Sequence, residues 1–300
     1  MKKCEKDGAL PAPPRCKLER GGNSLARTVA VITGASSGIG AVFARKLAPE
    51  HDLLLIARRK EKLDELAAEL TQQHACQVEV LQADLASDDG QSAAADRIAR
   101  EERLVLLVNN AGFGTRGRFW ESPLPAQEAM HRLHVLATVR LTHAALGNMV
   151  PKDRGGIINV ASVSAFVRSP GTVSYAATKS WMTVFTEGLY LELGGIGSNV
   201  VVQALCPGFT YSEFQASMGI SRERLAGSSL WMSPEYVVDQ SLEGLHRRKL
   251  FVIPGWRYRL ITAFLSKIPT ALRLKVETVA GRSRAHTLSL DDPSQKQITL

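Results

Sequence analysis

The stretch Thr28–Gly40 reads TVAVITGASSGIG, a short apolar run that leads directly into a glycine-rich turn. A helical pattern follows at once, near residues 39–49. Gly34, Gly38 and Gly40 let the backbone turn tightly and approach a pyrophosphate, and the helix N-terminus offers unpaired N–H groups there. A glycine-rich turn between the first strand and first helix of a βαβ unit therefore predicts a dinucleotide-binding site. The alternative is a turn with a steric role alone.

The alternation of short apolar runs and longer amphipathic stretches continues along the chain. The predicted strands are Thr28–Ile32, Leu53–Ala57, Gln77–Gln82, Leu104–Asn109, Ile157–Ala161 and Val200–Leu205. The predicted helices lie near residues 39–49, 60–73, 88–101, 123–149 and 172–194. Uniformly apolar short strands bracketed by helices favour a parallel sheet that is covered on both faces. The sequence therefore predicts an α/β fold with a doubly wound parallel sheet.

Composition argues against several other classes of protein. Of the 300 residues, 45% are hydrophobic and 22% are charged, values typical of a globular domain. The apolar runs are far shorter than the roughly 18 residues of a membrane-spanning helix, and no secretory signal is expected behind the N-terminal lysines. The four cysteines form no pairable pattern, so we expect reduced thiols in the cytoplasm. His131 and His134 share a helical face without further metal ligands, and we expect no metal site.

The net charge of +8 is concentrated in two segments outside the predicted fold. Residues 1–27 contain seven Lys and Arg against three acids, and residues 246–284 contain ten against Glu277 alone. The residues between these segments are mildly acidic. A nucleic-acid-binding protein would carry positive charge on its folded face, so we expect no nucleic-acid partner.

The C-terminal basic segment is also amphipathic. We expect a flexible N-terminal tail over 1–24, the main α/β domain over 25–250, a basic extension over 251–285 and a flexible tail over 286–300. Residues 250–276 mix Leu, Ile, Phe and Trp with Arg and Lys at near-helical spacing. Such a helix suits peripheral contact with an anionic inner membrane surface. It suits docking on its own domain, or on a partner subunit, equally well.

Arg58 and Arg59 follow the second predicted strand, where an NAD site would place an acidic residue on the ribose 2′-hydroxyl. Arginine complements a 2′-phosphate instead, so NADP(H) is favoured over NAD(H). The alternative is a charged, solvated helix start. At the end of the third strand, Asp84 and Leu85 offer a resting place for an adenine edge and ring. Asn109–Gly112 ends the fourth strand, at the carboxyl edge where such sheets bind ligands.

Tyr175 and Lys179 are four residues apart in a helical pattern, so their side chains share one face. A nearby ammonium group favours the phenolate, which makes Tyr175 a candidate acid/base for interconverting a hydroxyl and a carbonyl. Ser162 follows the fifth predicted strand, from which it could hydrogen-bond the same substrate oxygen. A Tyr-x-x-x-Lys pair alone is common and carries little weight.

The order of these parts carries more weight than any one of them. TGxxxGxG at Thr33–Gly40, NNAG at Asn109–Gly112, Ser162, the Tyr175–Lys179 pair and Pro207-Gly208 together resemble the classical type of the short-chain dehydrogenase/reductase family. The resemblance covers roughly residues 26–250. It implies a Rossmann-type sheet of about seven strands in a single domain, and hydride transfer to or from a nicotinamide. It also implies a homodimer or homotetramer, built through the long helices at 123–149 and 172–194.

The resemblance implies roles for individual residues. Tyr175 would be the general acid/base, Ser162 would orient the substrate oxygen, and Lys179 would hold the nicotinamide ribose and lower the Tyr175 pKa. Asn109 would border the cofactor. Residues expected to bind it are Gly34, Ser36, Ser37, Gly38, Ile39, Gly40, Arg58, Arg59, Asp84, Leu85, Asn109, Ala111, Gly112, Tyr175, Lys179, Pro207, Gly208 and Thr210.

One position departs from the family pattern. The family usually has an asparagine on the long helix after NNAG, where it helps to anchor a water linked to the lysine, and His134 aligns with that asparagine. An imidazole can also hold a water or relay a proton, so we count His134 among the catalytic residues. It could equally narrow the proton path and slow turnover. A local misalignment is the remaining explanation.

The loops expected to set specificity, residues 113–122 and 209–235, are rich in large apolar side chains. These are Phe113, Phe119, Trp120, Phe209, Tyr211, Phe214, Met218, Leu230, Trp231 and Met232. They favour an apolar carbonyl or alcohol as substrate, although several could simply pack the lid. The sequence thus predicts an NADPH-dependent carbonyl reductase. The alternatives are a catalytically impaired NADP(H)-binding regulator or scaffold, and a dehydratase or epimerase on the same fold.

Overall fold

The computed structural model describes residues 27–115, 117–167, 169–211, 230–268 and 274. The strands are β1 (Val29–Thr33), β2 (Asp52–Ala57), β3 (Val78–Gln82), β4 (Leu104–Asn109), β5 (Gly156–Val160), β6 (Val201–Leu205) and β7 (Phe251–Val252). The helices are α1 (Gly38–Leu47), α2 (Lys60–Gln73), α3 (Asp88–Ala99), α4 (Leu124–His131), α5 (Thr138–Met149), α6 (Val173–Gly195), α8 (Pro234–His246) and α9 (Trp256–Lys267). The predicted tails, residues 1–24 and 286–300, lie outside the described residues.

The seven strands form one parallel sheet in the order β3-β2-β1-β4-β5-β6-β7. This confirms the predicted doubly wound, Rossmann-type α/β fold, and six strands lie within one residue of their predicted bounds. The seventh strand, Phe251–Val252, pairs with Ala204 and Leu205 of β6. It therefore belongs to the sheet, although the sequence analysis assigned these two residues to the C-terminal extension.

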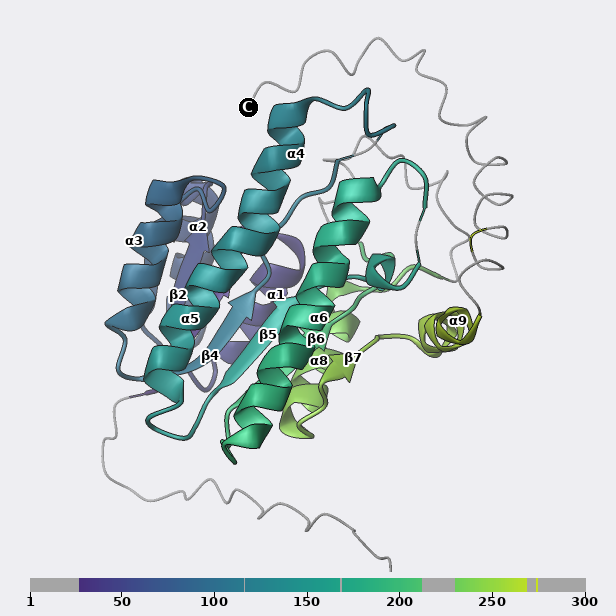
Figure 1. Cartoon of the computed structure of the whole chain (residues 1–300). Helices are drawn as coiled ribbons and strands as arrows, with labels where there is room; N and C mark the ends of the chain where they lie inside the picture. The colour runs from purple at the N-terminus through teal and green to yellow at the C-terminus, as the bar shows by residue number, and fades with distance from the viewer. Residues whose placement is uncertain (1–26, 116, 168, 212–229, 269–273, 275–300) are drawn as a thin grey trace, which may run out of the picture.

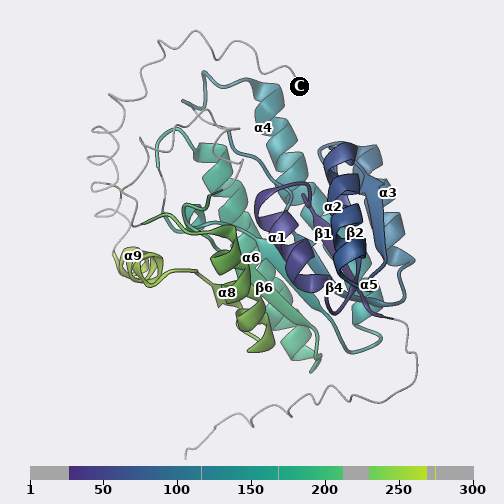
Figure 2. The same ribbon diagram turned by 180° about the vertical axis from the view of Figure 1, so that it is seen from behind.

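Helices cover both faces of the sheet, as the uniformly apolar strands require. Helices α3, α5 and α6 lie on the face toward the viewer in Figure 1, and α1, α2 and α8 lie on the opposite face, seen in Figure 2. Along β1, Ala30 and Ile32 pack with the α1, α2 and α8 side chains, whereas Val29 and Val31 pack with those of α3 and α5. Each strand therefore contributes alternate residues to two separate hydrophobic cores.

The crossover after β1 and the crossovers after β4 run on opposite faces of the sheet. Helix α1 follows β1 on one face, and α4 and α5 follow β4 on the other. Because β1 and β4 are adjacent, the loops at their carboxyl ends diverge and leave a crevice between them. This is the place where open parallel sheets bind their ligands.

The predicted helix near 123–149 contains an irregular turn. Residues Arg132–Ala137 form a π-helical segment between α4 and α5, so the helical stretch runs from Leu124 to Met149 with one widened turn. Such segments are rare and often occur at functional sites. His134 lies in this segment.

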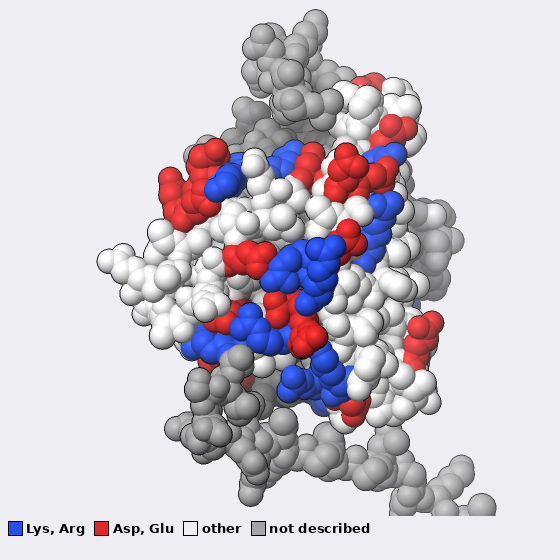
Figure 3. All heavy atoms as spheres, turned by 90° about the vertical axis from the view of Figure 1, so that its left-hand side faces the viewer, with Lys and Arg blue, Asp and Glu red and all other residues white. Residues whose placement is uncertain are grey.

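The charges on the sheet edge near α3 are mixed. Figure 3 shows Lys and Arg interspersed with Asp and Glu on this face, without a large patch of one sign. Arg97, for example, pairs with both Glu79 and Glu101, and Arg103 pairs with Asp52. Within the described part of the chain, no helix is both long and apolar enough to cross a membrane.

Candidate active site

The glycine-rich turn joins β1 to α1 in a conformation that needs glycine. Gly34 has φ +65° and Gly38 has φ +56°, values that side chains with a Cβ rarely adopt. A Cβ on Gly40 would lie 2.3 Å from the Gly34 carbonyl oxygen, so position 40 has no room for a side chain. Helix α1 then begins with no acidic residue in its first turn. Its N-terminal N–H groups can therefore face an anion.

Asn110 ties this turn to the loop after β4. Its Nδ2 donates to the carbonyl oxygens of Thr33 and Gly34 at 2.9 and 3.2 Å. The Thr33 hydroxyl accepts hydrogen bonds from the backbone N–H groups of Asn110 and Ala111 at 2.9 and 3.0 Å. A Cβ on Gly34 would stand 2.8 Å from the Ala111 Cα. Sequence analysis missed the roles of Thr33 and Asn110, because these bonds join two loops that are far apart in the sequence.

Arg59 reaches back over the glycine-rich turn. Its guanidinium donates to the hydroxyls of Ser36 and Ser37 at 2.9 and 2.8 Å. Arg58 is also exposed next to it, and its carbonyl oxygen accepts a bond from Gln82. The positive charge of Arg59 is therefore held beside two hydroxyl groups, an arrangement that suits a phosphate on a ribose.

Asp84 and Leu85 lie in the loop after β3, which ends at Gln82, the predicted last residue of this strand. Asp84 is exposed and accepts a bond from the Ala86 N–H. The Leu85 side chain is buried in the core against α3 and α5. Any contact between Leu85 and an adenine ring would therefore involve its backbone more than its side chain.

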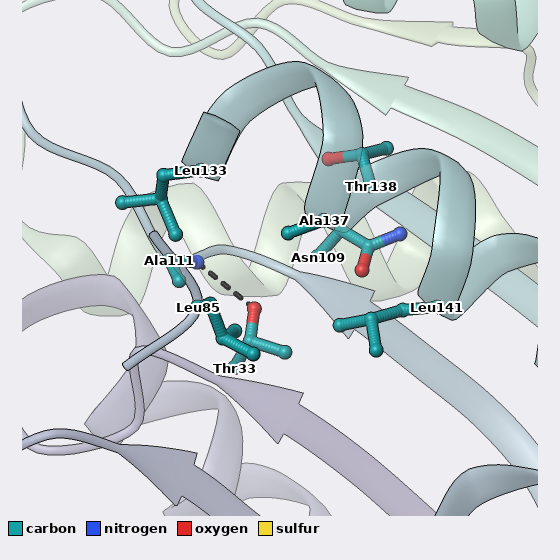
Figure 4. Close-up of a pocket in the computed structure, with 8 residues that line it drawn as sticks. All are labelled: Thr33, Leu85, Asn109, Ala111, Leu133, Ala137, Thr138 and Leu141. Carbon is teal, nitrogen blue, oxygen red and sulfur yellow. Dashed lines mark hydrogen bonds between the residues drawn. The ribbon is translucent and has the colours of Figure 1, made fainter. Parts of the chain in front are cut away.

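Leu85 also lines a small cavity below the crevice. The cavity has a volume of about 10 Å³, enough for about one water molecule. Figure 4 shows its lining residues, which come from the strand ends and from the helical stretch after β4: Thr33, Leu85, Asn109, Ala111, Leu133, Ala137, Thr138 and Leu141. The cavity is too small for a substrate or cofactor.

Asn109 points into the protein at the end of β4. Its Nδ2 donates to Thr142 Oγ1 at 3.1 Å and to Asn159 Oδ1 at 2.8 Å, and all three side chains are buried. Both bonds hold the β4 and β5 ends against α5. Because the Asn109 amide is engaged inside the protein, it is not placed to border a cofactor. The backbone of Ala111 and Gly112 is the part of this loop that could do so.

Ser162, Tyr175 and Lys179 converge from β5 and α6. Ser162 follows β5 and its Oγ accepts a bond from the Ser164 N–H. Tyr175 and Ser162 are joined by a side-chain hydrogen bond. One turn along α6, the Lys179 Nζ donates to the Val160 carbonyl oxygen at 2.8 Å and lies 5.8 Å from the centre of the Tyr175 ring. The sequence-predicted trio thus shares one site.

Burial shifts the acid–base chemistry of this group. It raises the pKa of Tyr175 to about 12, which the bond with Ser162 partly opposes. It lowers the pKa of Lys179 to about 7, and raises the pKa of the adjacent Cys206 thiol to about 12. In the protein alone, Tyr175 therefore keeps its proton at neutral pH, and Lys179 is close to half-charged.

His134 lies against this group from the π-helical segment. Its Nδ1 is 2.9 Å from Thr178 Oγ1, and the Thr178 hydroxyl donates to the Tyr175 carbonyl oxygen. Because that hydroxyl has one hydrogen, Nδ1–H is the donor to Thr178 and Nε2 carries the lone pair. Burial, with the positive charge of Lys179, keeps the His134 pKa well below its usual value. The ring is therefore neutral.

The Nε2 atom of His134 is buried without a hydrogen-bond partner in the described structure. A Cβ on Gly112 would lie 2.7 Å from it and 3.7 Å from the Lys179 Nζ. The loop after β4 therefore passes directly over both side chains. An unsatisfied buried acceptor beside an ammonium group suits a bridging water or a ligand hydroxyl.

The Pro207–Thr210 segment follows β6 and is fixed by a residue far along the chain. The ring of Tyr258 in α9 lies on Gly208, where a Cβ would be 2.1 Å from it. The Tyr258 hydroxyl accepts from the Phe209 N–H at 3.0 Å and donates to the Leu230 carbonyl oxygen at 2.8 Å. Sequence analysis missed this contact, because nothing in the local pattern around Tyr258 indicates it.

Some of the aromatic residues expected around the substrate form a stack. Trp231 packs against Phe209 and Tyr211 with ring centres 5.5 and 5.0 Å apart. Phe119 and Trp120 are exposed on the loop before α4. Phe214 and Met218 lie outside the described residues.

These features fit a nicotinamide dinucleotide. The glycine-rich turn offers a cradle that any Cβ would fill, Arg59 offers a cation beside it, and His134 offers an unsatisfied acceptor near Lys179. Within the described residues, no cluster of His, Cys, Asp or Glu could hold a metal ion. The residues that would hold the dinucleotide are those of the turn and of the loops after β2 and β4.

Comparison with known proteins agrees with this fold. Residues 28–222 match the family model described as short chain dehydrogenase. The very-long-chain 3-oxoacyl-CoA reductase of Anas platyrhynchos is 31% identical over 186 residues, which cover 59% of this chain and 58% of that protein. The alignment therefore spans less than two thirds of that relative.

Solved structures match over more of the chain. A short-chain dehydrogenase from Sphingobium yanoikuyae in complex with NADPH is 33% identical, covers 91% of this chain and 98% of its own, and superposes with a TM-score of 0.71. The bulky-bulky ketone specific alcohol dehydrogenase from Comamonas testosteroni is 31% identical, with 81% and 96% coverage and a TM-score of 0.69.

Proposed function

The chain belongs to the short-chain dehydrogenase family, and on this premise we propose that it is an NADPH-dependent reductase of apolar ketones or acyl-type carbonyls. One observation carries the proposal. Ala111 and Gly112 bridge the glycine-rich turn and the catalytic group, since Ala111 packs on Gly34 and Gly112 passes over Lys179 and His134. A dinucleotide held by the turn would therefore extend toward Tyr175.

The bound cofactor would supply a hydride to the carbonyl carbon. Tyr175 then donates its phenolic proton to the carbonyl oxygen, which becomes the hydroxyl of the product. Ser162 donates a second hydrogen bond to that oxygen and holds it in reach of Tyr175. The charged form of Lys179 stabilises the phenolate left on Tyr175. In the reverse, oxidative direction, Tyr175 would act as the base that removes the proton from the substrate hydroxyl.

His134 serves as the hydrogen-bond acceptor for a water in a proton path that leads to Lys179. Its neutral ring has a lone pair on Nε2 beside the Lys179 ammonium group. A water held between them would allow a proton from solvent to reach Lys179 and then Tyr175. This is the task that the resemblance assigns to an asparagine at this position.

The preference for NADP(H) rests on Arg59. Its guanidinium lies against Ser36 and Ser37, where the 2′-phosphate of the cofactor would add a third acceptor. Both residues directly after β2 are arginines, and neither is the acidic residue that would accept a hydrogen bond from a free 2′-hydroxyl. The NADPH complex of the Sphingobium relative points in the same direction.

The apolar substrate class rests on the aromatic residues at the mouth of the site. The stack of Phe209, Tyr211 and Trp231 offers a flat apolar wall of the kind that binds hydrocarbon or ring systems. The names of the relatives, a very-long-chain 3-oxoacyl-CoA reductase and a bulky-bulky ketone alcohol dehydrogenase, agree with such substrates.

The active form is proposed to be a homodimer or homotetramer. Helix α6 leaves Val184 and Leu191 exposed at 67% and 66%. These side chains are seven residues apart, a spacing that places them on one face of the helix. Pairing of two such helices would bury them.

Direct titration with both cofactors tests the proposal. Binding is measured by intrinsic fluorescence, and we expect NADPH to bind more tightly than NADH. We also expect NADPH to be oxidised in the presence of bulky apolar ketones. Tighter binding of NADH would contradict the role of Arg59. NADPH binding without oxidation across a broad carbonyl panel would favour a regulator or scaffold. Conversion of a substrate with no net change in nicotinamide absorbance would indicate a dehydratase or epimerase.

A further inference from the structure

Helix α9 has an inner face that packs on the active-site loop. Tyr258 and Thr262 are its buried side chains, four residues apart, and the Thr262 hydroxyl donates to the Tyr258 carbonyl oxygen. The Tyr258 hydroxyl holds Phe209 and Leu230 together. Phe209 begins the predicted substrate loop, residues 209–235, and Leu230 lies within it, so the helix is fixed to the mouth of the site.

Among the described residues, the outer face of α9 is apolar and exposed. Trp256, Leu260 and Phe264 are 62%, 60% and 68% exposed, and their spacing of four places them on one face. Ile261 widens this stripe. In Figures 1 and 2 the helix lies beyond the β7 edge of the sheet, apart from the six helices that cover its faces. We call these four residues the outer stripe.

The residues around the outer stripe are cationic. Arg257, Arg259 and Lys267 are exposed on the same helix, and Arg257 stacks over the Trp256 ring. No acidic residue occurs in the sequence between Glu243 and Glu277. A second copy of this chain would bring the same cations against each other. A surface with an apolar interior and anionic headgroups complements both features at once.

We propose that α9 docks on an anionic phospholipid surface through the outer stripe, with Arg257, Arg259 and Lys267 on the headgroups. Because Tyr258 on the opposite face holds the substrate loop, docking brings the mouth of the active site to the membrane. The substrate class is then a carbonyl compound dissolved in lipid. This last step rests on the proposed reductase function, whereas the docking itself does not.

Vesicle binding by the full chain tests the docking. We expect it to cosediment with vesicles of phosphatidylglycerol and phosphatidylcholine, and much less with phosphatidylcholine alone, because the cations need an anionic partner. Trp256→Ser combined with Phe264→Ser should lower the partition coefficient by about tenfold or more, since two large side chains no longer enter the lipid. The Trp256 fluorescence should shift to the blue when wild-type protein binds.

The matched control is Ile196→Ser, at a side chain that is 68% exposed near the opposite end of the sheet. It should bind vesicles like the wild type. NADPH oxidation with a water-soluble ketone, measured on every variant, should be unchanged by the α9 substitutions. Loss of vesicle binding with this activity intact supports docking, whereas absent activity with intact vesicle binding would contradict only the reductase function.

Three results would overturn the docking proposal. The first is wild-type protein that does not bind anionic vesicles. The second is a Trp256→Ser, Phe264→Ser variant that binds them as the wild type does. The third is a fall in oligomer mass in this variant without a change in vesicle binding, because the outer stripe would then cover a second copy of the chain.

Discussion

Lys179 is the residue whose charge state the fold controls most directly. Its side chain is buried, its Nζ donates to the Val160 carbonyl oxygen, and its neighbours include the Met182 sulfur. Burial lowers its pKa to about 7. An unfolded chain would restore the ordinary lysine pKa of about 10.4. Folding and protonation of this one side chain are therefore linked.

The sign of this linkage can be tested by a stability measurement. Between about pH 7 and pH 10, unfolding takes up a proton on Lys179, so the free energy of unfolding should rise with pH, by at most about 1.4 kcal/mol per pH unit. Lys179→Met removes the titrating group. We expect the stability of wild type relative to this variant to increase over that range, measured by denaturant unfolding without cofactor.

Exposed Lys249 supplies the control. The difference between wild type and Lys249→Met should stay flat with pH. Burial raises the pKa values of Tyr175 and Cys206 to about 12, so unfolding releases protons from them above about pH 8.5 to 10. Both groups are present in wild type and in each variant, so this contribution cancels in the differences. A flat difference for Lys179→Met as well would show that Lys179 stays charged in the folded protein.

Arg59 is the residue proposed to select NADP(H) over NAD(H). Replacing Arg59 by Glu removes the guanidinium from Ser36 and Ser37 and sets a carboxylate against the 2′-phosphate. A charge-assisted hydrogen bond contributes about 1.5–3 kcal/mol, so NADPH affinity should fall by about 10- to 100-fold. NADH affinity should stay the same or rise, because its 2′-hydroxyl can donate to the new carboxylate.

Arg154→Glu is the charge-matched control, at an exposed position before β5 and so at the opposite edge of the sheet. It makes the same change in net charge and should leave both affinities unaltered. Fluorescence titration of both variants with both cofactors measures the effect. An unchanged ratio of NADPH to NADH affinity in Arg59→Glu would remove Arg59 from the cofactor site.

At the scale of elements, the strands were predictable and the irregular turn was not. Short apolar runs such as Leu53–Ala57 have one explanation in a chain of this composition, burial on both faces. The π-helical segment Arg132–Ala137 has an ordinary helical sequence pattern. This segment packs against α6, where His134 contacts Thr178. Position 134 could be identified from the sequence, but its tautomer and its contacts could not.

For the predicted catalytic pair, too, the sequence indicates the positions but not the state of the protons. Helical periodicity alone puts Tyr175 and Lys179 on one face, and the structure has both at the site. The state of their protons depends on burial, however, and burial depends on the whole fold. The resemblance implies a lysine that lowers the tyrosine pKa, whereas in the protein alone the pKa of Tyr175 is raised to about 12. Full charge on Lys179 is therefore expected to require a bound ligand.

At the scale of the whole molecule, distant parts of the chain meet at one edge of the sheet. The turn after β1, the loop after β4 and the segment after β6 converge there, and α9 adds Tyr258 from the C-terminal region. Motif order in the sequence predicted the first three contributions. The contact of Tyr258 with Gly208 could not be predicted, because 50 residues separate them in a region without any motif. The same contact links the proposed reductase site to the outer stripe of α9.

The role of Tyr175 is the central claim, and Tyr175→Phe tests it most directly. The variant lacks only the phenolic hydroxyl, so NADPH should bind within about threefold of wild type, while kcat with an accepted ketone should fall by about 10²- to 10⁴-fold. Tyr190→Phe, at an exposed position on the same helix, should keep full turnover. Survival of turnover in Tyr175→Phe, with kcat within a few-fold of wild type, would contradict the assignment of Tyr175 as the acid/base.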